Sequence, residues 1–560
     1  NPLFIEEILR MLIDGGSLVR GERGWHLASP TFEIRIPDTI HSLLAARLDL
    51  LPPLERRVTQ DAAVMGRVFW LGALLATDSL NAAEAAAVLE RLQERELVEE
   101  RAPSSLAGER EFIFKHALVR EVAYSTLPKA ARSDRHLRFA RWLQGSATQG
   151  RDKFLEVLAY HYEQAWRYRF ETGDKDPHLA RQAIAALRAA GARALSLRTL
   201  PEARRLHERA LAVLRNAGLE EDVVLLLELL TGRSEVVKWM SQPAVLLEDT
   251  EMVLRLAPAV GRDDLLARAW LNRAFAEYLH ERLEASEEAL GRALQLFADL
   301  GDRQGEAEAL EVLGRVTEGL RGTLSKAHVA YRKAMELYRQ LQDGQGLART
   351  MAYLGRSLLD GGDLEEARRV LAEGLALARA HHERISEAKC LMGLAVLAHL
   401  AGDSPASIRR HEETIALVQE LGDAVGAAAV RRHLGMHYLR QRRVDEAERE
   451  MRAAYALYRE HAPDEPAFIL RGMAEVLLAR GDLLAAADHA ERALAGIAPE
   501  DPVGLATYGA TLGRIRAAQG RGQEAEELFR RSLELLEKSE YRVDLALTLY
   551  KYGDALRLLG

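Results

Sequence analysis

A repeat of about 40 residues constrains the fold of this 560-residue chain more than any other sequence feature. A small residue recurs at intervals of 39–42 residues from position 191 to position 553. The series is Gly191, Gly232, Ala274, Gly314, Gly355, Ala395, Gly435, Ala474, Gly513 and Gly553. Ten small residues at so regular a spacing indicate repeated copies of one structural unit.

A second small residue follows each of the first nine by about 12 positions. This second series is Ala203, Ala244, Ser286, Ala327, Ala367, Ser407, Ala447, Ala486 and Ala525, with Ala327 displaced by one position. Turns such as Gly362–Asp363 lie between the two series, and apolar residues around them keep helical spacing. Small residues allow two helices to approach closely, so each unit is predicted to be a helical hairpin. Stacked hairpins form a solenoid.

The two small positions resemble the pattern of the tetratricopeptide repeat (TPR) family. The best matches are Leu354-Gly355 with Ala367, Leu434-Gly435 with Ala447, and Leu512-Gly513 with Ala525. The resemblance covers residues 181–560 and implies an α-α superhelical solenoid of about nine to ten repeats. The family unit is usually about 34 residues, so longer helices or longer links are expected here, with the links at residues 298–302 and 420–423. Residues 219–261 form the weakest repeat.

The first part of the chain has a different pattern. In residues 1–35, an amphipathic helix over 3–13 is followed by Gly15-Gly16 and a short hairpin over 17–27. In residues 36–145, helices are predicted over 37–50, 53–65 and 82–95, and strands over 96–100 and 111–114. Helices that close on a two-stranded wing predict a winged-helix-like domain, and residues 146–180 are predicted to be linking helices. The expected fold class is therefore mainly α.

Residues 1–145 also resemble the segment that follows the nucleotide-binding domain in STAND-type ATPases. The residues that carry this resemblance are Asn1-Pro2-Leu3-Phe4, Ile36-Pro37, Phe114-Lys115-His116-Ala117-Leu118 and Ala123-Tyr124. Such ATPases are fused to bacterial Ser/Thr kinases, adenylate or guanylate cyclases and transcription activators. The resemblance implies a regulatory segment of a bacterial signalling protein, and the sequence, which begins without Met, is expected to be a fragment that lacks the ATPase domain.

A winged helix also allows a second interpretation, a transcription regulator that binds DNA. Residues 1–145 hold about 19 Lys and Arg against about 20 Asp and Glu. The candidate recognition helix carries Glu84, Glu90 and Glu94, whereas a helix that enters a DNA groove needs Lys, Arg, Asn or Gln. The charge pattern therefore favours a regulatory hinge, and nucleic acid is not the expected partner.

Composition sets the remaining limits. The chain is 48% hydrophobic and 29% charged with a net charge of -8, so it can bury a large core without attracting nucleic acid or anionic lipid. Neither a membrane span nor a signal peptide is predicted, which makes the cytoplasm the expected location. The single cysteine, Cys390, is expected to be a small buried residue on a helix.

No pattern of catalytic or cofactor-binding residues stands out. The chain has no Gly-x-x-x-x-Gly-Lys-Ser/Thr phosphate loop and no nucleophile elbow. His433 and His437 have a spacing that can chelate zinc, but no third ligand accompanies them. We therefore expect no enzyme activity, cofactor or metal site in this chain, and any catalysis belongs to upstream domains.

The candidate binding residues are arginines on the expected inner face of the solenoid. Arg315, Arg356 and Arg514 directly follow a first-series small residue, and Arg432 and Arg471 stand three residues before one. Arginine forks onto carboxylates and phosphates, so these five predict a groove for an acidic protein or peptide. The alternative is an inner face that is merely solvated or salt-bridged. The chain is thus expected to bind a partner and to relay that binding to the upstream ATPase domain.

Overall fold

The computed structural model describes residues 8–10, 12–13, 18–21, 24–27, 39–76, 80–146, 151–197, 199–240, 242–319, 323–461, 466–499 and 501–559. They divide into two compact units, Asn1–Met240 and Ser241–Gly560. Within these residues, no helix combines the length and the apolar character that a membrane span requires. The motifs Asn1–Phe4, Gly15-Gly16 and Ile36-Pro37, and most of the predicted helix over 3–13, lie outside the described residues.

The first unit begins with short strands and helices, among which are the predicted hairpin, the predicted helices and the two predicted strands of residues 1–145. They are β1 (Leu18–Gly21), β2 (Gly24–Leu27), α2 (Ile40–Asp49), α3 (Pro53–Met65), β3 (Val68–Trp70), α4 (Leu71–Leu75), α5 (Ala82–Glu94), β4 (Val98–Arg101), β5 (Glu111–Phe114), α6 (Ala117–Ser125) and α7 (Lys129–Ser146). The β1–β2 hairpin is antiparallel, with Leu18 opposite Leu27, as expected.

The two strands predicted as a wing belong to a sheet with a third strand. β5 pairs antiparallel with both β4 and β3, in the order β3-β5-β4. Phe69, Phe112 and Phe114 are fully buried and pack against one another across β3 and β5. β3 is only three residues long, which is too short for an alternating pattern to reveal it.

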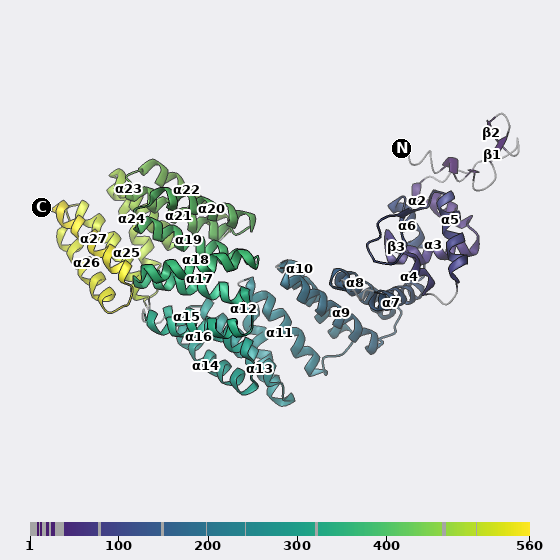
Figure 1. Cartoon of the computed structure of the whole chain (residues 1–560), viewed down its shortest axis with the longest axis horizontal. Helices are drawn as coiled ribbons and strands as arrows, with labels where there is room; N and C mark the ends of the chain where they lie inside the picture. The colour runs from purple at the N-terminus through teal and green to yellow at the C-terminus, as the bar shows by residue number, and fades with distance from the viewer. Residues whose placement is uncertain are drawn as a thin grey trace. The chain divides into compact units, whose positions relative to one another are not determined.

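Helical pairs follow in both units (Figure 1). The first unit continues with η1 (Arg151–Phe154), α8 (Leu155–Glu171), α9 (Pro177–Ser196), α10 (Leu200–Asn216) and α11 (Val223–Trp239). The second unit contains α12 (Pro243–Leu256), η2 (Ala257–Val260), α13 (Asp263–Leu279), α14 (Leu283–Leu300), α15 (Arg303–Gly319), α16 (Leu324–Gln340), α17 (Gly344–Gly361), α18 (Leu364–Ala380), α19 (Arg384–Leu400), α20 (Ser404–Glu420), α21 (Ala424–Arg440), α22 (Val444–His461), α23 (Ala467–Arg480), α24 (Leu483–Ala495), α25 (Pro502–Ala518), α26 (Gly522–Glu537) and α27 (Arg542–Leu559).

The predicted repeat is confirmed helix by helix. All ten residues of the first small series lie on the odd-numbered helices α9 to α27, and all nine of the second series lie on the even-numbered helices α10 to α26. A Cβ at Gly355 would lie 2.5 Å from Cγ of Leu371 on the partner helix, so only glycine fits there. The Ser286 hydroxyl donates to the carbonyl of Ala274 at 2.7 Å, which joins the two small positions directly. The solenoid is mainly α, as the sequence predicted.

The additional length of each repeat lies in the helices and not in the links. Most helices from α13 to α21 have 17 residues, whereas Gly301–Asp302 and Leu421–Asp423 link the pairs as short turns. The expectation that these segments supply the extra length is therefore wrong. The turns are tight because glycine takes a left-handed conformation, as at Gly402 with φ 80°, and the next aspartate caps the following helix.

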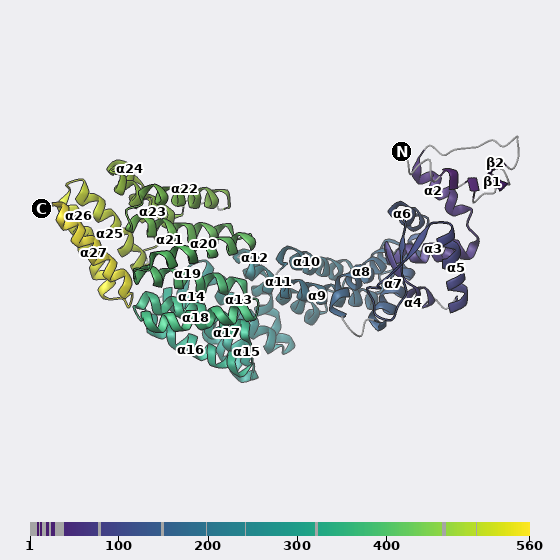
Figure 2. The same ribbon diagram turned by 45° about the horizontal axis from the view of Figure 1, so that its top comes forward.

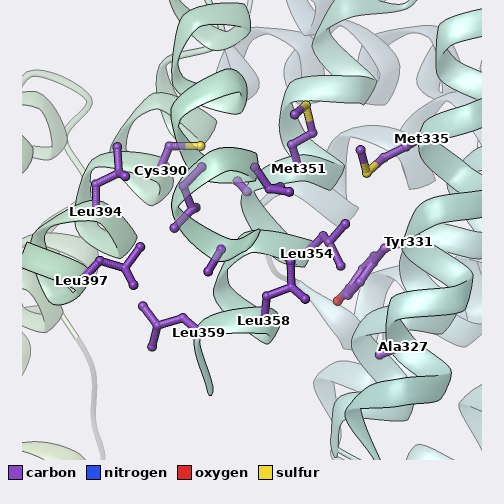
Figure 3. Packing of buried hydrophobic residues seen from close by; sticks show 14 residues of the cluster. Ala327, Tyr331, Met335, Met351, Leu354, Leu358, Leu359, Cys390, Leu394 and Leu397 are labelled. Atoms are coloured by element: carbon purple, nitrogen blue, oxygen red, sulfur yellow. The ribbon is translucent and has the colours of Figure 1, made fainter. Parts of the chain in front are cut away.

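A continuous apolar core joins neighbouring pairs. One cluster includes Tyr331 of α16, Leu354 and Leu358 of α17, Leu371 of α18 and Cys390 of α19 (Figure 3). All five side chains are buried, and burial raises the pKa of the Cys390 thiol to about 12. Cys390 is thus the small core residue that the sequence predicted, and each hairpin buries its apolar face against the next one.

Polar side chains one repeat apart also contact each other. Arg268 pairs with Glu308, 40 residues later, and Arg349 Nε donates to Glu311 Oε1, 38 residues earlier, at 2.9 Å. Such pairs lie on first helices of adjacent repeats. The repeat period is therefore also a contact rule, because a side chain on one first helix meets the side chain at nearly the same place in the next repeat.

The second unit coils so that its last helix returns to its earlier ones. α27 packs against α17 (Figures 1 and 2). The segment just before α27 contacts α15 and α16. Glu540 accepts hydrogen bonds from the Ser325 amide at 2.6 Å and the Ser325 hydroxyl at 2.9 Å. The Tyr541 hydroxyl donates to the Glu318 carbonyl at 3.2 Å. These contacts, more than 200 residues apart in sequence, enclose the inner face of this unit.

Candidate binding cavity

The inner face of the second unit encloses a cavity of about 1030 Å³. Its lining comes mainly from the first helices of successive repeats, which are α13, α15, α17, α19, α21, α23, α25 and α27. The expectation that a groove follows the first helices agrees with this geometry. Since one side chain or more from each of eight helices reaches the cavity, its chemistry is set by residues spread over nearly 300 positions of sequence.

The structure brings four of the five candidate arginines into this cavity. Arg315 of α15, Arg356 of α17, Arg432 of α21 and Arg471 of α23 are lining residues. Arg514 of α25 is not a lining residue. It lies between two carboxylates, with Nη1 3.0 Å from Glu475 Oε2 and Nε 2.9 Å from Asp554 Oδ2. For Arg514, therefore, the alternative of a salt-bridged inner face applies.

Arg315 is held by aromatic rings. Its guanidinium carbon lies 5.3 Å from the ring centre of Phe275, 4.7 Å from Tyr278 and 5.1 Å from Tyr353. Phe275 and Tyr278 also pack against the core around α13–α15, as does Trp270. The cluster of Trp270, Phe275 and Tyr278 is therefore part of the core and also lines the cavity at Tyr278.

Arg356 lies at the same side of the cavity, beside acidic residues. Its Nε donates to Asp360 Oδ2, one turn later, at 2.9 Å, and its side chain is 57% exposed. Glu318 lies nearby on α15, and one of its carboxylate oxygens is buried without a hydrogen-bond partner among the described residues. Burial raises the pKa of Glu318 to about 7, so this carboxyl group is partly protonated at neutral pH.

Arg432 and Arg471 lie on neighbouring first helices without a carboxylate. The Arg432 Nη2 donates to His433 Nε2 at 2.7 Å, and its guanidinium lies 5.7 Å from the ring centre of Phe468. Arg471 lies 4.5 Å from the ring centre of Tyr508. Burial and the positive charge of Arg471 lower the pKa of Arg432 to about 9.

Histidines complete this side of the cavity, and they are neutral. Burial, with the nearby positive charge of Arg440, lowers the pKa of His399 to about 4, and burial lowers the pKa of His411 to about 4. His437 shares a 2.5 Å hydrogen bond with His399, whereas His433 accepts from Arg432. His433 and His437 therefore turn to different partners. In the described ranges, no group of three or more His, Cys, Asp or Glu side chains is placed to hold a metal ion.

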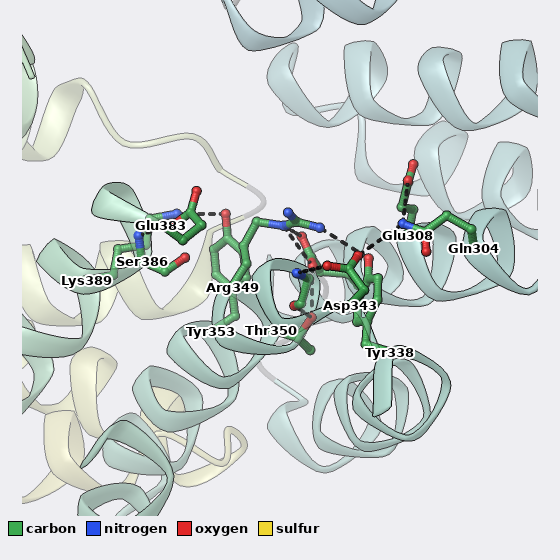
Figure 4. Close-up of polar contacts among 12 residues, drawn as sticks. Gln304, Glu308, Tyr338, Asp343, Arg349, Thr350, Tyr353, Glu383, Ser386 and Lys389 are labelled. Atoms are coloured by element: carbon green, nitrogen blue, oxygen red, sulfur yellow. Dashed lines mark hydrogen bonds and ion pairs between the residues drawn. The ribbon is translucent and has the colours of Figure 1, made fainter. Parts of the chain in front are cut away.

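A buried polar network lies on α15, α16 and α17. Glu311 accepts from Arg349 Nε at 2.9 Å and from the Thr350 hydroxyl at 2.8 Å, and Arg349 also donates to the Tyr338 hydroxyl at 3.2 Å. Figure 4 shows Arg349, Thr350 and Tyr338 converging, with Lys389 donating to Tyr353 at 2.8 Å on the other side. The charge of Arg349 is thus neutralised inside the protein.

Several lining residues were not singled out from the sequence. Arg440, whose Nη1 donates to His399 Nε2 at 2.8 Å, adds a cation to the α21 side. Tyr541 and Asp544, at the start of α27, also line the cavity. Arg440 could have been found, because it stands 41 residues after His399, one repeat later. The α27 residues carry no such signal, since they reach the cavity through the coil of the whole unit.

Comparisons with known proteins agree with this fold. No protein-family model matches the sequence, and no curated protein does. Among solved structures, a signal transduction ATPase with numerous domains (STAND) protein with a tetratricopeptide repeat sensor, from Pyrococcus horikoshii, is similar with a TM-score of 0.52 and 14% identity over 87% of this chain. The chain spans 66% of the length of that protein. At this identity the similarity shows a shared TPR-like solenoid fold.

Two further solved structures have lower scores. A Rap protein complexed with competence and sporulation factor has a TM-score of 0.47 and 15% identity, covering 63% of this chain and 98% of its own. The apo form of the quorum sensor NprR from B. thuringiensis has a TM-score of 0.43 and 12% identity, covering 63% of this chain and 94% of its own.

Proposed function

We propose that this chain is a protein-interaction and effector-sensing scaffold that binds its partner in the inner cavity of the second unit. The observation that carries the proposal is a single cavity of about 1030 Å³ that receives side chains from eight first helices and contains four of the predicted arginines. A ligand there touches many repeats at once, so its binding is coupled to the relative positions of those repeats.

The cavity favours an anionic partner. Arg432 and Arg471 keep their charges without a carboxylate among the described residues, and the histidines beside them are neutral. Arginine in a partly desolvated site binds carboxylates and phosphates through charge-assisted hydrogen bonds. An acidic protein segment or peptide is therefore the partner class that the lining supports.

The proposal also includes a relay, by which binding of the partner is transmitted to an upstream ATPase domain. Residues 1–35 are assigned to the end of an ATPase-associated segment, 36–145 to a winged-helix-like regulatory domain, 146–180 to linking helices and 181–560 to the solenoid. The resemblance of residues 1–145 to the region after the nucleotide-binding domain of STAND ATPases supports a hinge between an upstream ATPase domain and this sensor. The proposal assigns no catalysis and no cofactor to the chain itself.

Charge reversal in the cavity tests the proposal. We expect Arg356→Glu combined with Arg471→Glu to reduce partner capture at least about tenfold, since two charge-assisted contacts of about 1.5–3 kcal/mol each are lost. The matched control is Arg369→Glu on α18, whose side chain is 61% exposed and lies outside the cavity. The stability of both variants should stay within about 1 kcal/mol of the wild type, because the ion pairs of Arg356 and Arg369 are exposed. Equal capture by the cavity variant and the control contradicts the proposal.

A further inference from the structure

The arginines predicted as one groove differ in what neutralises them. Arg514 has two carboxylates, Arg356 has one, and Arg315 is surrounded by three aromatic rings. Arg432 and Arg471 have none among the described residues. The uncompensated charge is thus concentrated on α21 and α23 and is not spread along the whole inner face.

The contact rule of the repeat explains why these two charges stay together. Arg432 and Arg471 each stand three residues before the small residue of their first helix, and they are 39 positions apart. Residues at the same position in successive repeats meet on the inner face, so Arg432 and Arg471 are neighbours. The same place holds Met392 in the preceding repeat and Ala510 in the following one, and neither can neutralise them.

Arg432 also has a donor with nothing to bind. Its Nε is buried and makes no hydrogen bond among the described residues, while Nη2 donates to His433. A buried guanidinium donor without an acceptor is unfavourable, and an oxygen of a ligand would satisfy it. Burial and Arg471 together lower the pKa of Arg432 to about 9, in keeping with two adjacent like charges.

The other charged groups nearby do not neutralise the pair. Arg440 adds a third guanidinium, bonded to neutral His399. Asp544 of α27 lines the cavity and its charge interacts with that of Arg471, but it forms no ion pair with Arg432 or Arg471 in the described ranges, and burial raises its pKa. The site therefore presents at least two positive charges to whatever enters it.

We propose that Arg432 and Arg471 form a subsite for the phosphate monoester group of a small molecule held in the cavity. The inference rests on the proposed function, because it takes the cavity to be the ligand site, but it assigns the Arg432–Arg471 subsite to a small effector molecule and not to the acidic peptide. A phosphate monoester carries a charge of about −1.5 to −2 and three acceptor oxygens, which match two guanidinium groups and one orphaned donor. A carboxylate has one charge and two oxygens, and it leaves one arginine unpaired.

The size of the cavity agrees with a small ligand. Cavities that hold small molecules measure about 300–1,000 Å³, and this one is about 1030 Å³. Tyr508 and Phe468 flank the two guanidinium groups, so the subsite has apolar walls beside its charges. Polar donors among aromatic walls are typical of sites that fix the orientation of a small anionic molecule.

Calorimetric titration tests the subsite, with phenyl phosphate, inorganic phosphate and benzoate as probes. We expect phenyl phosphate to bind at least about tenfold more tightly than benzoate, and its binding to be lost in Arg432→Gln combined with Arg471→Gln. Arg432→Lys with Arg471→Lys keeps the charges without the fork and should retain weakened binding. Arg369→Gln, on the outer face, should bind like the wild type.

Three results would overturn the inference: equal affinity for phenyl phosphate and benzoate, undiminished binding by a folded glutamine double variant, or no binding of either phosphate. A phosphoserine peptide that binds more tightly than phenyl phosphate would assign the group to a modified polypeptide instead of a small molecule. Partner capture that depends on the cavity charges while phosphates fail to bind would remove the subsite and leave the proposed function standing.

Discussion

At two places on the inner face, side chains from successive repeats meet, but their charges alternate at one place and are alike at the other. At Glu475, Arg514 and Asp554, the residues that follow the small position in three successive repeats alternate in charge and pair at 3.0 and 2.9 Å. At Arg432 and Arg471, two successive repeats place like charges together. The first arrangement binds the repeats to one another, and the second leaves charge available for a ligand.

This difference teaches that an inner-face arginine cannot be interpreted alone. Its role depends on the residue one repeat before it and one repeat after it. A carboxylate at that distance makes the arginine structural, and a second arginine or an apolar residue makes it a candidate for binding.

The largest effect is expected from Glu475→Ala, which removes the centre of the alternating arrangement. Glu475 is buried and also pairs with Lys551 at 2.6 Å, so its loss leaves Lys551 without its carboxylate and Arg514 with Asp554 alone. We expect a loss of about 3–5 kcal/mol in the unfolding free energy of the C-terminal repeats. Urea denaturation measures it, with Glu526→Ala on the exposed face of α26 as a control near zero.

The same carboxylate gives a pH dependence with a defined sign. Burial alone would raise the pKa of Glu475, but Lys551 and Arg514 lower it to about 2. Because the folded pKa lies below the unfolded value near 4.5, the stabilisation is present above about pH 4.5 and is lost as the pH falls towards 2. Glu475→Ala should lack this part of the acid sensitivity. An unchanged acid profile in the variant would contradict the assignment.

A smaller effect of opposite sign is expected from Arg471→Glu, which turns the like-charged pair into an alternating one. Arg432 then gains a carboxylate one repeat away and loses a repulsive neighbour. We expect the melting temperature to rise, corresponding to about 1 kcal/mol, while anion binding in the cavity disappears. A clear loss of stability would show that Arg471 is already compensated inside the protein.

A further pH-dependent effect concerns Glu318, a buried acid that no arginine neutralises by an ion pair in the described part of the chain. Burial raises its pKa to about 7, so the cost of ionising it in the folded state grows as the pH rises from about 4.5 through 7. Glu318→Gln should therefore be more stable than the wild type by up to about 3 kcal/mol above pH 7 and close to it near pH 4.5. Melting temperatures of both proteins measured across this pH range test the prediction. A difference that does not change with pH would contradict the raised pKa of Glu318.

The repeat period made most of the fold predictable. Ten positions such as Gly355 and Ala474 identified every first helix from α9 to α27, because close packing of helices tolerates only small residues there. The split of the extra length between helices and links was not predictable, since a 40-residue period fits either arrangement. The strand β3, at Val68–Trp70, was missed because three residues carry no periodicity.

The candidate site was predictable in part. The inner-face register correctly placed Arg315, Arg356, Arg432 and Arg471 at one cavity. It did not separate Arg514, although Glu475 and Asp554 stand one repeat away on either side and could have been identified by the same spacing. The closure by Glu540 and Tyr541 was beyond such reasoning, because small rotations summed over many repeats decide where α27 returns.

Reversible blocking of the cavity tests the central claim most directly. Met436 lines the cavity, Val329 on α16 is 54% exposed outside it, and the one native cysteine, Cys390, is buried. Met436→Cys and Val329→Cys can each be labelled with a bulky methanethiosulfonate reagent and then reduced, and partner capture is measured at each step. The account predicts that labelling at position 436 lowers capture at least about tenfold, that reduction restores it, and that labelling at 329 has no effect. Full capture by the labelled 436 variant would contradict binding in the cavity.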